Sequence, residues 1–224
     1  ARPNFMKVAP IHRLMMNDPR ISPVLVHTGQ HYDENMSKVF FEELELPPCD
    51  VHLGVGSGSH TEQTARVMLE FERVCLGENP DLAVVVGDVN STLGCAIVAP
   101  KLGIPVAHVE AGLRSGDRSM PEEINRLITD QISSFLFIHS PEAEQNLLRE
   151  GIKTERIFSV GNIMIDSLVH HLPKAESLYE ERLRSEFPRR EYGLVTLHRP
   201  SNVDDPVHLG RLIHALEHLA EQVP

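Results

Sequence analysis

Two short apolar runs in the middle of the chain constrain its fold more than any other feature. Residues 83–86 and 105–109 are rich in β-branched side chains, and each run is followed by a carboxylate beside a glycine or an alanine. A segment with helical character lies between them. A strand, a helix and a second strand form a βαβ unit, in which the strands are parallel and buried on both faces.

The same alternation of strand and helix patterns continues on both sides of this unit. Helices are predicted at residues 5–16, 33–44, 59–76, 121–133, 141–150 and 163–171, and strands at 21–27, 51–55, 135–139 and 156–160. Ser59 and Glu62 form a capping-box pattern at one helix start, and Ser140 is a predicted N-cap at another. The pattern therefore predicts an α/β fold with a doubly wound, mostly parallel, Rossmann-like sheet.

A change in composition near residue 173 indicates a domain boundary. Residues 1–172 carry the alternating pattern, whereas 173–190 are charged and poorly periodic apart from a helical run at 176–187. A fresh strand pattern at 192–197 and a helix pattern at 206–222 then follow. We interpret 173–190 as a linker or boundary helix and 191–224 as the start of a truncated second Rossmann-like domain, so that the chain is a fragment.

The net charge limits the partners that the sequence favours, and the cysteine content indicates the compartment. A net charge of −11 disfavours nucleic acids and anionic membranes, which require a basic surface. The sequence contains neither an apolar run of about 18 residues nor a secretion leader. Three cysteines are most simply reduced thiols of a cytoplasmic protein, and the histidines lack metal-ligand spacing, so no metal is expected.

Asp88 and Glu110 are the first candidates for chemistry. They follow the two central strands, and ligands of parallel sheets bind outside the carboxyl ends of such strands. The two acids are therefore expected in one crevice. Asp88 has an alternative role as a cap of the following helix. Glu110 has fewer alternative roles, because a carboxylate beside an apolar strand is costly unless it is paired or hydrated.

Other residues are more ambiguous when each is taken alone. Glu122 fits a capping box with Ser119 or an i,i+4 pair with Arg126, and a structural role is favoured. The loop at 54–58 fits a dinucleotide fingerprint poorly, because Ser59 replaces the third glycine. Six basic residues near predicted strand ends or loops are candidates for binding a diphosphate, although solvated surface charge is the default for each: Arg2, Lys7, Arg114, Arg118, Arg126 and Arg199.

These residues belong to longer motifs that resemble the UDP-N-acetylglucosamine 2-epimerase family. The most specific are His-Val-Glu-Ala-Gly-Leu-Arg at 108–114 and Pro-Glu-Glu-Ile-Asn-Arg at 121–126. The remaining motifs have the family's order and approximate spacing: Arg2-Pro3 with Lys7, Thr28-Gly29-Gln30-His31, Gly87-Asp88, Gly161-Asn162 with Asp166, and His198-Arg199. The resemblance extends over almost the whole chain.

The resemblance implies the first half of a glycosyltransferase-B-type architecture with two Rossmann-like domains, usually as a homodimer. It implies reversible epimerisation of UDP-N-acetylglucosamine at C2, with UDP elimination to 2-acetamidoglucal and no cofactor, because no hydride moves. By position, the residues implied to be catalytic are Asp88, Glu110, Glu122 and His198. Those implied to contact the substrate and its diphosphate are Arg2, Lys7, Arg126 and Arg199, and a possible activator site includes Gln30 and Arg66.

The sequence departs from the family near its C-terminal end, and two alternatives stay open. Many members carry His-Arg-Arg-Glu-Asn where residues 198–202 read His-Arg-Pro-Ser-Asn. A hydrolysing relative would use the same carboxylates but release N-acetylmannosamine and UDP. A non-enzymatic nucleotide-binding domain would instead use the glycine-rich loop at 54–58.

Overall fold

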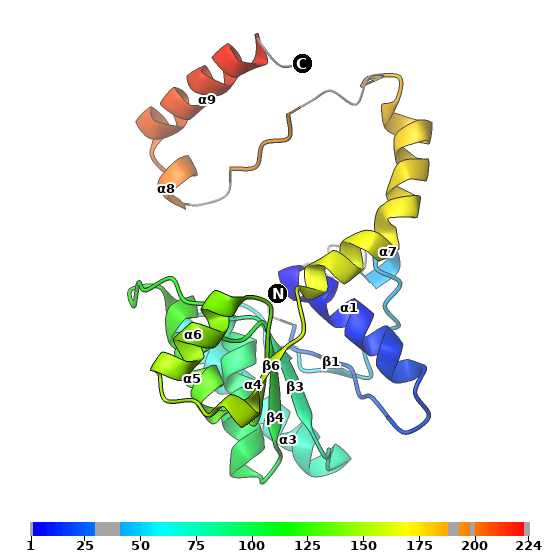
Figure 1. Ribbon diagram of the computed structural model, residues 1–224, viewed down its shortest axis with the longest axis vertical. Coiled ribbons are helices and arrows are strands. Elements are labelled where there is room, and N and C mark those ends of the chain that lie inside the picture. Colours follow the sequence, from blue (N-terminus) through cyan, green and yellow to red (C-terminus); the bar gives the residue numbers. More distant parts are fainter. Residues whose placement is uncertain (1, 30–40, 188–192, 198–199, 222–224) are drawn as a thin grey trace. The chain divides into compact units, whose positions relative to one another are not determined.

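The computed structural model describes residues 2–29, 41–187, 193–197 and 200–221 (Figure 1). The chain divides into two compact units, Ala1–His170 and His171–Pro224, which are described separately.

The first unit is built on four parallel strands. β3 (Ala83–Val86), β4 (Val106–Val109), β5 (Phe135–Ile138) and β6 (Ile157–Ser159) are neighbours in chain order. The connecting helices are α4 (Asn90–Lys101), α5 (Pro121–Ile132) and α6 (Pro141–Arg149). The central βαβ unit is confirmed, and β4 is buried along its whole length. Val86 pairs with Val109, so the loops after β3 and β4 begin at the same edge.

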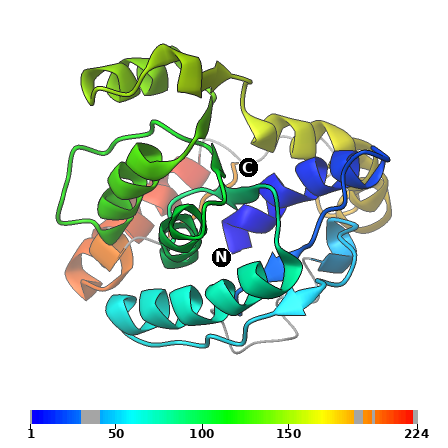
Figure 2. The same cartoon turned by 90° about the horizontal axis from the view of Figure 1, so that it is seen from below.

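Helices cover this sheet in two layers (Figure 2). Right-handed crossovers between strands placed in sequential order put α4, α5 and α6 on one face. α4 packs between α3 (His60–Glu78) and α5, and the main apolar core lies between α3, α4 and the strands. α1 (Arg2–Met16) contacts β3, and the hydroxyl of Ser167 in α7 (Ile163–Leu178) donates a hydrogen bond to the Met6 carbonyl. The predicted α/β fold is therefore observed.

A second, two-stranded parallel sheet stands beside the first. It pairs β1 (Val26–His27) with β2 (Val51–His52), so both predicted strands form but are shorter than expected. The helix predicted at 33–44 lies largely outside the described residues. α3 begins with the expected capping box of Ser59 and Glu62. The amide of Gly56 donates to the Gly29 carbonyl at 2.8 Å, which anchors the 54–58 loop to the chain after β1.

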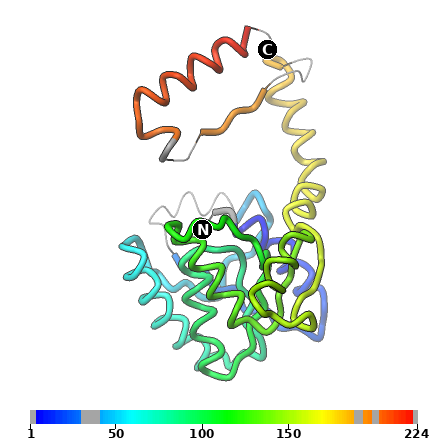
Figure 3. Tube along the Cα trace, turned by 60° about the vertical axis from the view of Figure 1, so that its left-hand side comes forward, coloured from blue at the N-terminus to red at the C-terminus, as the bar shows by residue number. Residues whose placement is uncertain are grey.

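Residues 171–224 form the second unit, and helix α7, which spans the boundary at residue 170, is longer than the sequence predicts (Figure 3). The pattern predicts an end at 171, but α7 continues to Leu178 and is followed by a π-helical turn at Tyr179–Leu183. Pro173 is tolerated because the surrounding residues are exposed and water can satisfy the freed carbonyl. α8 (Pro200–Val203) contacts α9 (Pro206–Ala220), which has Asp205 as its N-cap.

The strand predicted at 192–197 is not found in its described part, since residues 193–197 have no regular secondary structure. A strand requires a neighbour for its backbone hydrogen bonds, and the described part of this unit contains no other strand.

Burial makes two of the three cysteine thiols unreactive. Cys75 and Cys95 are buried and Cys49 is half-buried, and all three are free. Desolvation raises the pKa of the Cys95 thiol far above its usual value, so its reactive thiolate form is suppressed. None of the helices in the described ranges combines the length and apolarity needed to cross a bilayer.

The close approach of α3 and α4 depends on a glycine. A Cβ on Gly94 would lie 2.8 Å from Cγ1 of Val67 and 3.3 Å from the Thr64 carbonyl oxygen. We expect Gly94→Ala to lower the free energy of unfolding by about 1–3 kcal/mol, because overpacking outweighs the better helix propensity of alanine. Urea unfolding followed by circular dichroism measures the change.

Gly77→Ala in α3 is the matched control, since nothing lies within 4 Å of a Cβ there. It should raise stability by about 0.5–1 kcal/mol. Equal stability of the two variants would contradict close packing at Gly94.

Candidate active site at the ends of two parallel strands

A glycine turn brings Asp88 to the carboxyl edge of the sheet. Gly87 has φ +69°, and a Cβ there would lie 2.9 Å from Oδ1 of Asn4. Its amide donates to the Val109 carbonyl at 3.0 Å, which extends the β3–β4 ladder by one bond. The side-chain amide of Asn4 in turn donates to the Val86 carbonyl at 2.9 Å. The start of α1, the end of β3 and the end of β4 are thus held together around Asp88.

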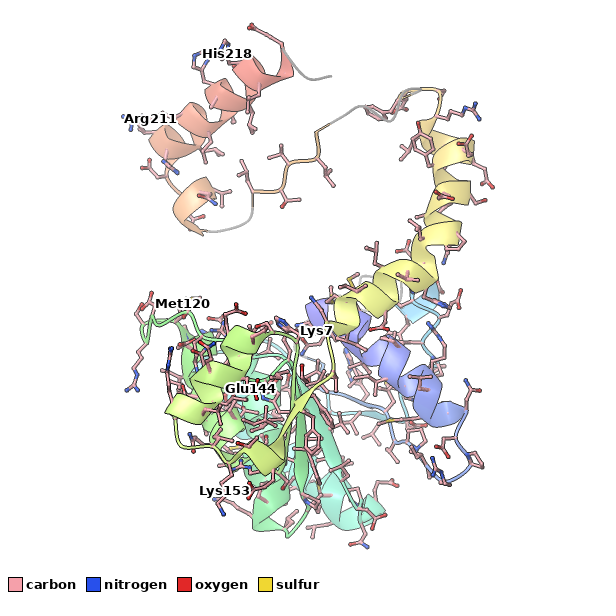
Figure 4. The ribbon with its side chains drawn as sticks, viewed as in Figure 1. Lys7, Met120, Glu144, Lys153, Arg211 and His218 are labelled. Carbon is pink, nitrogen blue, oxygen red and sulfur yellow. The ribbon has the colours of Figure 1, made fainter. Side chains whose placement is uncertain are left out.

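Glu110 occupies a strained position at the end of β4. Its φ is +72°, which non-glycine residues rarely adopt and which costs roughly 1–3 kcal/mol. The amides of Glu110 and Ala111 both donate to the Phe137 carbonyl at 3.1 Å, and these bonds hold the backbone in this conformation. The carboxylate pairs with the ammonium group of Lys7, a nearly buried residue in the N-terminal half of α1 (Figure 4).

Arg126 links Asp88 to a second carboxylate. Its Nε and Nη2 atoms lie 2.9 Å from Oδ2 of Asp88, and its Nη1 lies 2.5 Å from Oε2 of Glu123. The side-chain amide of Asn125 donates to the Asp88 carbonyl at 2.8 Å. Asp88 does not cap α4, because Val89 is the N-cap of that helix and makes no side-chain cap bond.

Glu123 is the acid that the sequence interpretation missed. It is buried, and it accepts hydrogen bonds of 3.0 Å from the amides of both Ser115 and Gly116. Desolvation raises the pKa of the Glu123 carboxyl, but these amides and Arg126 outweigh that effect, so the net pKa lies below the usual value. Glu123 therefore remains ionised and fixes both Arg126 and the loop before α5.

The capping box predicted for Glu122 is wrong. α5 begins at Pro121 with Met120 as an N-cap that makes no side-chain bond. Ser119 lies before that N-cap, and its hydroxyl and its amide both donate to Asp117, at 2.7 and 2.9 Å. The predicted pairing of Glu122 with Arg126 is also not found, because Arg126 faces Glu123 and Asp88.

His108 and Asp130 are fully buried and form the centre of a polar chain beneath the two loops. His108 Nε2 lies 2.8 Å from the Gly87 carbonyl oxygen, and its Nδ1 lies 2.7 Å from Oδ1 of Asp130. Oδ2 of Asp130 accepts from the Gly112 amide at 3.1 Å and from Arg114 at 2.7 Å. Burial lowers the pKa of the Arg114 guanidinium, but Glu150 and Asp130 outweigh burial and raise it. The sequence alone did not indicate the His108–Asp130 pair.

Five predicted site residues remain to be placed. His198, Arg199 and Gln30 lie outside the described residues. Arg2 is the first residue of α1. Arg66 is exposed on α3 and donates to the Val55 carbonyl at 3.3 Å. Among the described residues, no three potential ligands are arranged to hold a metal ion.

The arrangement suits proton transfer more than nucleophilic or redox chemistry. Two carboxylates stand at adjacent strand ends, each paired with a cation, and a carboxylate is a group that can accept and return a proton. A cavity of about 330 Å³ lined by α1, the sheet and the start of α7 has Glu110 in its wall. Its other walls are mainly apolar, but they also include His139 and the motif residues Asn162 and Asp166.

Comparison with known proteins finds one family throughout. The family profile described as UDP-N-acetylglucosamine 2-epimerase matches residues 13–224. A UDP-N-acetylglucosamine 2-epimerase of Methanocaldococcus jannaschii is 48% identical over 224 residues, which cover 98% of this chain and 60% of that protein. A UDP-2,3-diacetamido-2,3-dideoxy-D-glucuronate 2-epimerase of Pseudomonas aeruginosa is 42% identical, with 98% and 61% covered.

Solved structures agree with the sequence comparison. The crystal structure of the M. jannaschii enzyme in complex with UDP-GlcNAc and UDP has a TM-score of 0.86 and covers 98% of this chain and 60% of that chain, at 48% identity. The Neisseria meningitidis UDP-GlcNAc 2-epimerase bound to UDP-GlcNAc has a TM-score of 0.83, at 28% identity, with 90% and 56% covered. The chain thus spans about 60% of the length of the curated relatives it matches.

The paired charges predict a pH-dependent contribution of Glu123 to stability. Because its folded pKa is depressed, this contribution is present above the usual value of 4.5 and is lost as the pH falls through the folded pKa. We expect Glu123→Gln to lower the free energy of unfolding by about 1–3 kcal/mol at pH 7, with the difference shrinking in acid. Urea unfolding between pH 3 and 7 measures it.

Glu122→Gln provides the matched control on the same helical turn, since Glu122 has no ion pair with any described residue. Its stability should follow the wild type at every pH. A pH-independent effect of Glu123→Gln would show that its charge is not what stabilises the loop.

Proposed function

The chain belongs to the UDP-N-acetylglucosamine 2-epimerase family, and from this premise we propose that the full-length protein interconverts UDP-N-acetylglucosamine and UDP-N-acetylmannosamine. The observation that carries the proposal is the placement of Asp88 and Glu110 at adjacent strand ends, each beside a cation. Two proton-transfer groups near one sugar carbon are what inversion at C2 requires, because a single fixed carboxylate reaches only one face.

The proposed reaction begins with the bond between sugar C1 and the diphosphate oxygen. This bond breaks with its electrons going to UDP, and the resulting oxocarbenium character at C1 acidifies C2. A carboxylate then takes the C2 proton and 2-acetamidoglucal forms. UDP adds back to C1 as a protonated acid delivers a proton to C2 from the opposite face. Asp88, Glu110 and Glu122 are the proposed acid/base set.

The cations in the site have a second proposed role. Lys7 and Arg126 each face a carboxylate, and an incoming diphosphate offers them another anionic partner. Positive charge fixed near the leaving group stabilises the charge that develops as the C1–O bond breaks. We propose Arg2, Arg199 and His198 as further residues that bind the substrate or its diphosphate, with 191–224 as the start of a second, UDP-binding domain.

UDP re-addition rather than capture by water makes this a non-hydrolysing enzyme in our proposal. The hydrolysing alternative predicts UDP accumulation and free N-acetylmannosamine, which chromatography of the reaction detects. The glycine-rich loop alternative predicts saturable NAD binding by calorimetry. Because the 54–58 loop is already bonded to residues 28 and 29 through its own backbone, it is less suited to cradle a pyrophosphate.

The relative from P. aeruginosa supports a second candidate substrate. At 42% identity it is almost as similar to this chain as the M. jannaschii protein, and its name specifies a diacetamido glucuronate derivative. Both substrates would undergo the same inversion at C2. Parallel measurement of kcat/KM with the two nucleotide sugars on the full-length protein separates them, since a mismatched substituent at C3 or C6 loses contacts in the transition state.

The proposed chemistry predicts the effect of neutral isosteres. In the full-length protein, Asp88→Asn and Glu110→Gln should each reduce turnover by about 10²–10⁴-fold, because an amide cannot accept the proton. Proton NMR with UDP-N-acetylglucosamine in deuterated water should show loss of C2 exchange, with unchanged circular dichroism.

Glu155→Gln is the control, because Glu155 is exposed and its Lys153 contact is long at 3.9 Å. It should exchange at the wild-type rate. Near-wild-type exchange in Asp88→Asn or Glu110→Gln would refute the role assigned to that residue.

We further propose that the protein is a homodimer that uses the outer face of α5. Ile124, Ile128 and Ile132 form an exposed stripe there, between 36% and 45% accessible. Arg118 lies before the start of this helix and Glu150 lies against its end, where its carbonyl accepts from Gln131. Antiparallel pairing of two stripes would bring each Arg118 toward Glu150 of the second copy, whose carboxylate it would share with Arg114.

This surface predicts that Ile128→Asp weakens dimerisation, because it places a charge at the centre of an apolar contact. Sedimentation equilibrium of the full-length protein should show a monomer, or a dissociation constant raised at least about tenfold, which corresponds to about 1.4 kcal/mol. Leu14→Asp, at an exposed position of α1, should leave the mass unchanged. An intact Ile128→Asp dimer would exclude this face.

A further inference from the structure

His108 is fully buried and both of its ring nitrogens face acceptors. The Gly87 carbonyl is an acceptor only, and so is the Asp130 carboxylate when ionised. Asp130 also accepts from the Gly112 amide and from Arg114, so its two oxygens already have donors directed at them. This donor set favours the ionised carboxylate. His108 must then carry a proton on both nitrogens to satisfy its two partners.

The contacts of His108 and Asp130 connect the backbone of the two candidate acids. Gly87 immediately precedes Asp88, and Gly112 follows Glu110 by two residues. One ring and one carboxylate therefore bridge the end of β3 to the loop after β4 through three bonds of 2.7–3.1 Å. Because Gly112 also leaves no room for a Cβ, which would lie 2.6 Å from the Ala143 carbonyl, this loop has little freedom to move.

We propose that His108 is a positioning residue, held as an imidazolium by Asp130, that fixes the Asp88 loop relative to the Glu110 loop. The inference rests on the proposed epimerase function, because it deepens the account of the same site. His108 touches neither proposed acid directly and acts through the Gly87 carbonyl and through Asp130.

The charges around His108 balance within the first unit. Asp130 approaches from α5, Arg114 from the loop after β4, and Glu150 from the end of α6. Lys7 approaches Gly87 from α1 and pairs with Glu110. The chain His108, Asp130, Arg114 and Glu150 alternates in sign, so the buried imidazolium has a compensating neighbour.

Two substitutions separate geometry from charge. His108→Phe keeps an aromatic ring but removes both bonds, so the two loops lose their bridge. Asp130→Asn keeps the bridge, because the new amide can donate to Nδ1 of a neutral His108 while Nε2–H still donates to the Gly87 carbonyl. The oxygen of that amide still accepts from Gly112. Ser133→Ala removes another buried bond next to α5, at 2.7 Å, and serves as the structural control.

The test uses the full-length protein with UDP-N-acetylglucosamine and measures kcat, KM and the released intermediate. His108→Phe should lower kcat by about 100-fold, as expected for a misplacement of roughly 1 Å, with KM within about threefold. Free UDP and 2-acetamidoglucal should rise relative to product, because the groups that remove and return the C2 proton are no longer held at fixed positions relative to each other. Asp130→Asn and Ser133→Ala should leave this ratio at the wild-type value.

Nitrogen-15 NMR of the histidine ring tests the imidazolium without any substrate. The His108 signals should report protons on both nitrogens in the wild type, and on Nε2 alone in Asp130→Asn. A neutral ring in the wild type, or equal loss of kcat in Asp130→Asn and His108→Phe, would overturn the proposal. If His108→Phe does not fold, the ring signals and Asp130→Asn still decide it. If the wild type shows no C2 exchange, the proposed function fails while the NMR result stands.

Discussion

Charge compensation at the carboxyl edge of β3 and β4 is the constraint on which the rest of the site depends. Asp88 and Glu110 are brought together by strand pairing, and two carboxylates so placed would repel each other unless cations were supplied. Lys7 arrives from α1 and Arg126 from α5. The helices on the two faces of the sheet are therefore tied to the same edge by ion pairs as well as by apolar packing.

The backbone around the site is held as firmly as the side chains. Glu110 has a positive φ without being a glycine, and such strain persists only where the surroundings enforce it. The Phe137 carbonyl, the Asp130 carboxylate and the close contact of Gly112 with Ala143 supply that enforcement. These contacts hold the strained Glu110 backbone in one conformation. That fits its proposed role as a proton-transfer group that keeps its position while the C2 proton is removed and while it is returned.

The sequence predicts the elements better than their side-chain partners. The observed bounds of β3 are the predicted ones, because a β-branched run that ends at a glycine has few other conformations. The topology alone places Asp88 and Glu110 at one edge. The capping box expected for Glu122 does not form, since α5 begins after Met120 and Ser119 lies in a loop whose conformation no periodicity encodes. His108 and Asp130 are 22 residues apart and meet only through tertiary packing.

α5 connects the site to the outer surface of the first unit. Its inward face carries Glu123, Asn125, Arg126 and Asp130, which bind the loops after β3 and β4. Its outward face carries the isoleucines at intervals of four residues. Arg126 and the isoleucine stripe therefore lie on opposite faces of one helix of twelve residues. The proposed dimer contact and the proposed proton chemistry depend on the placement of that same helix.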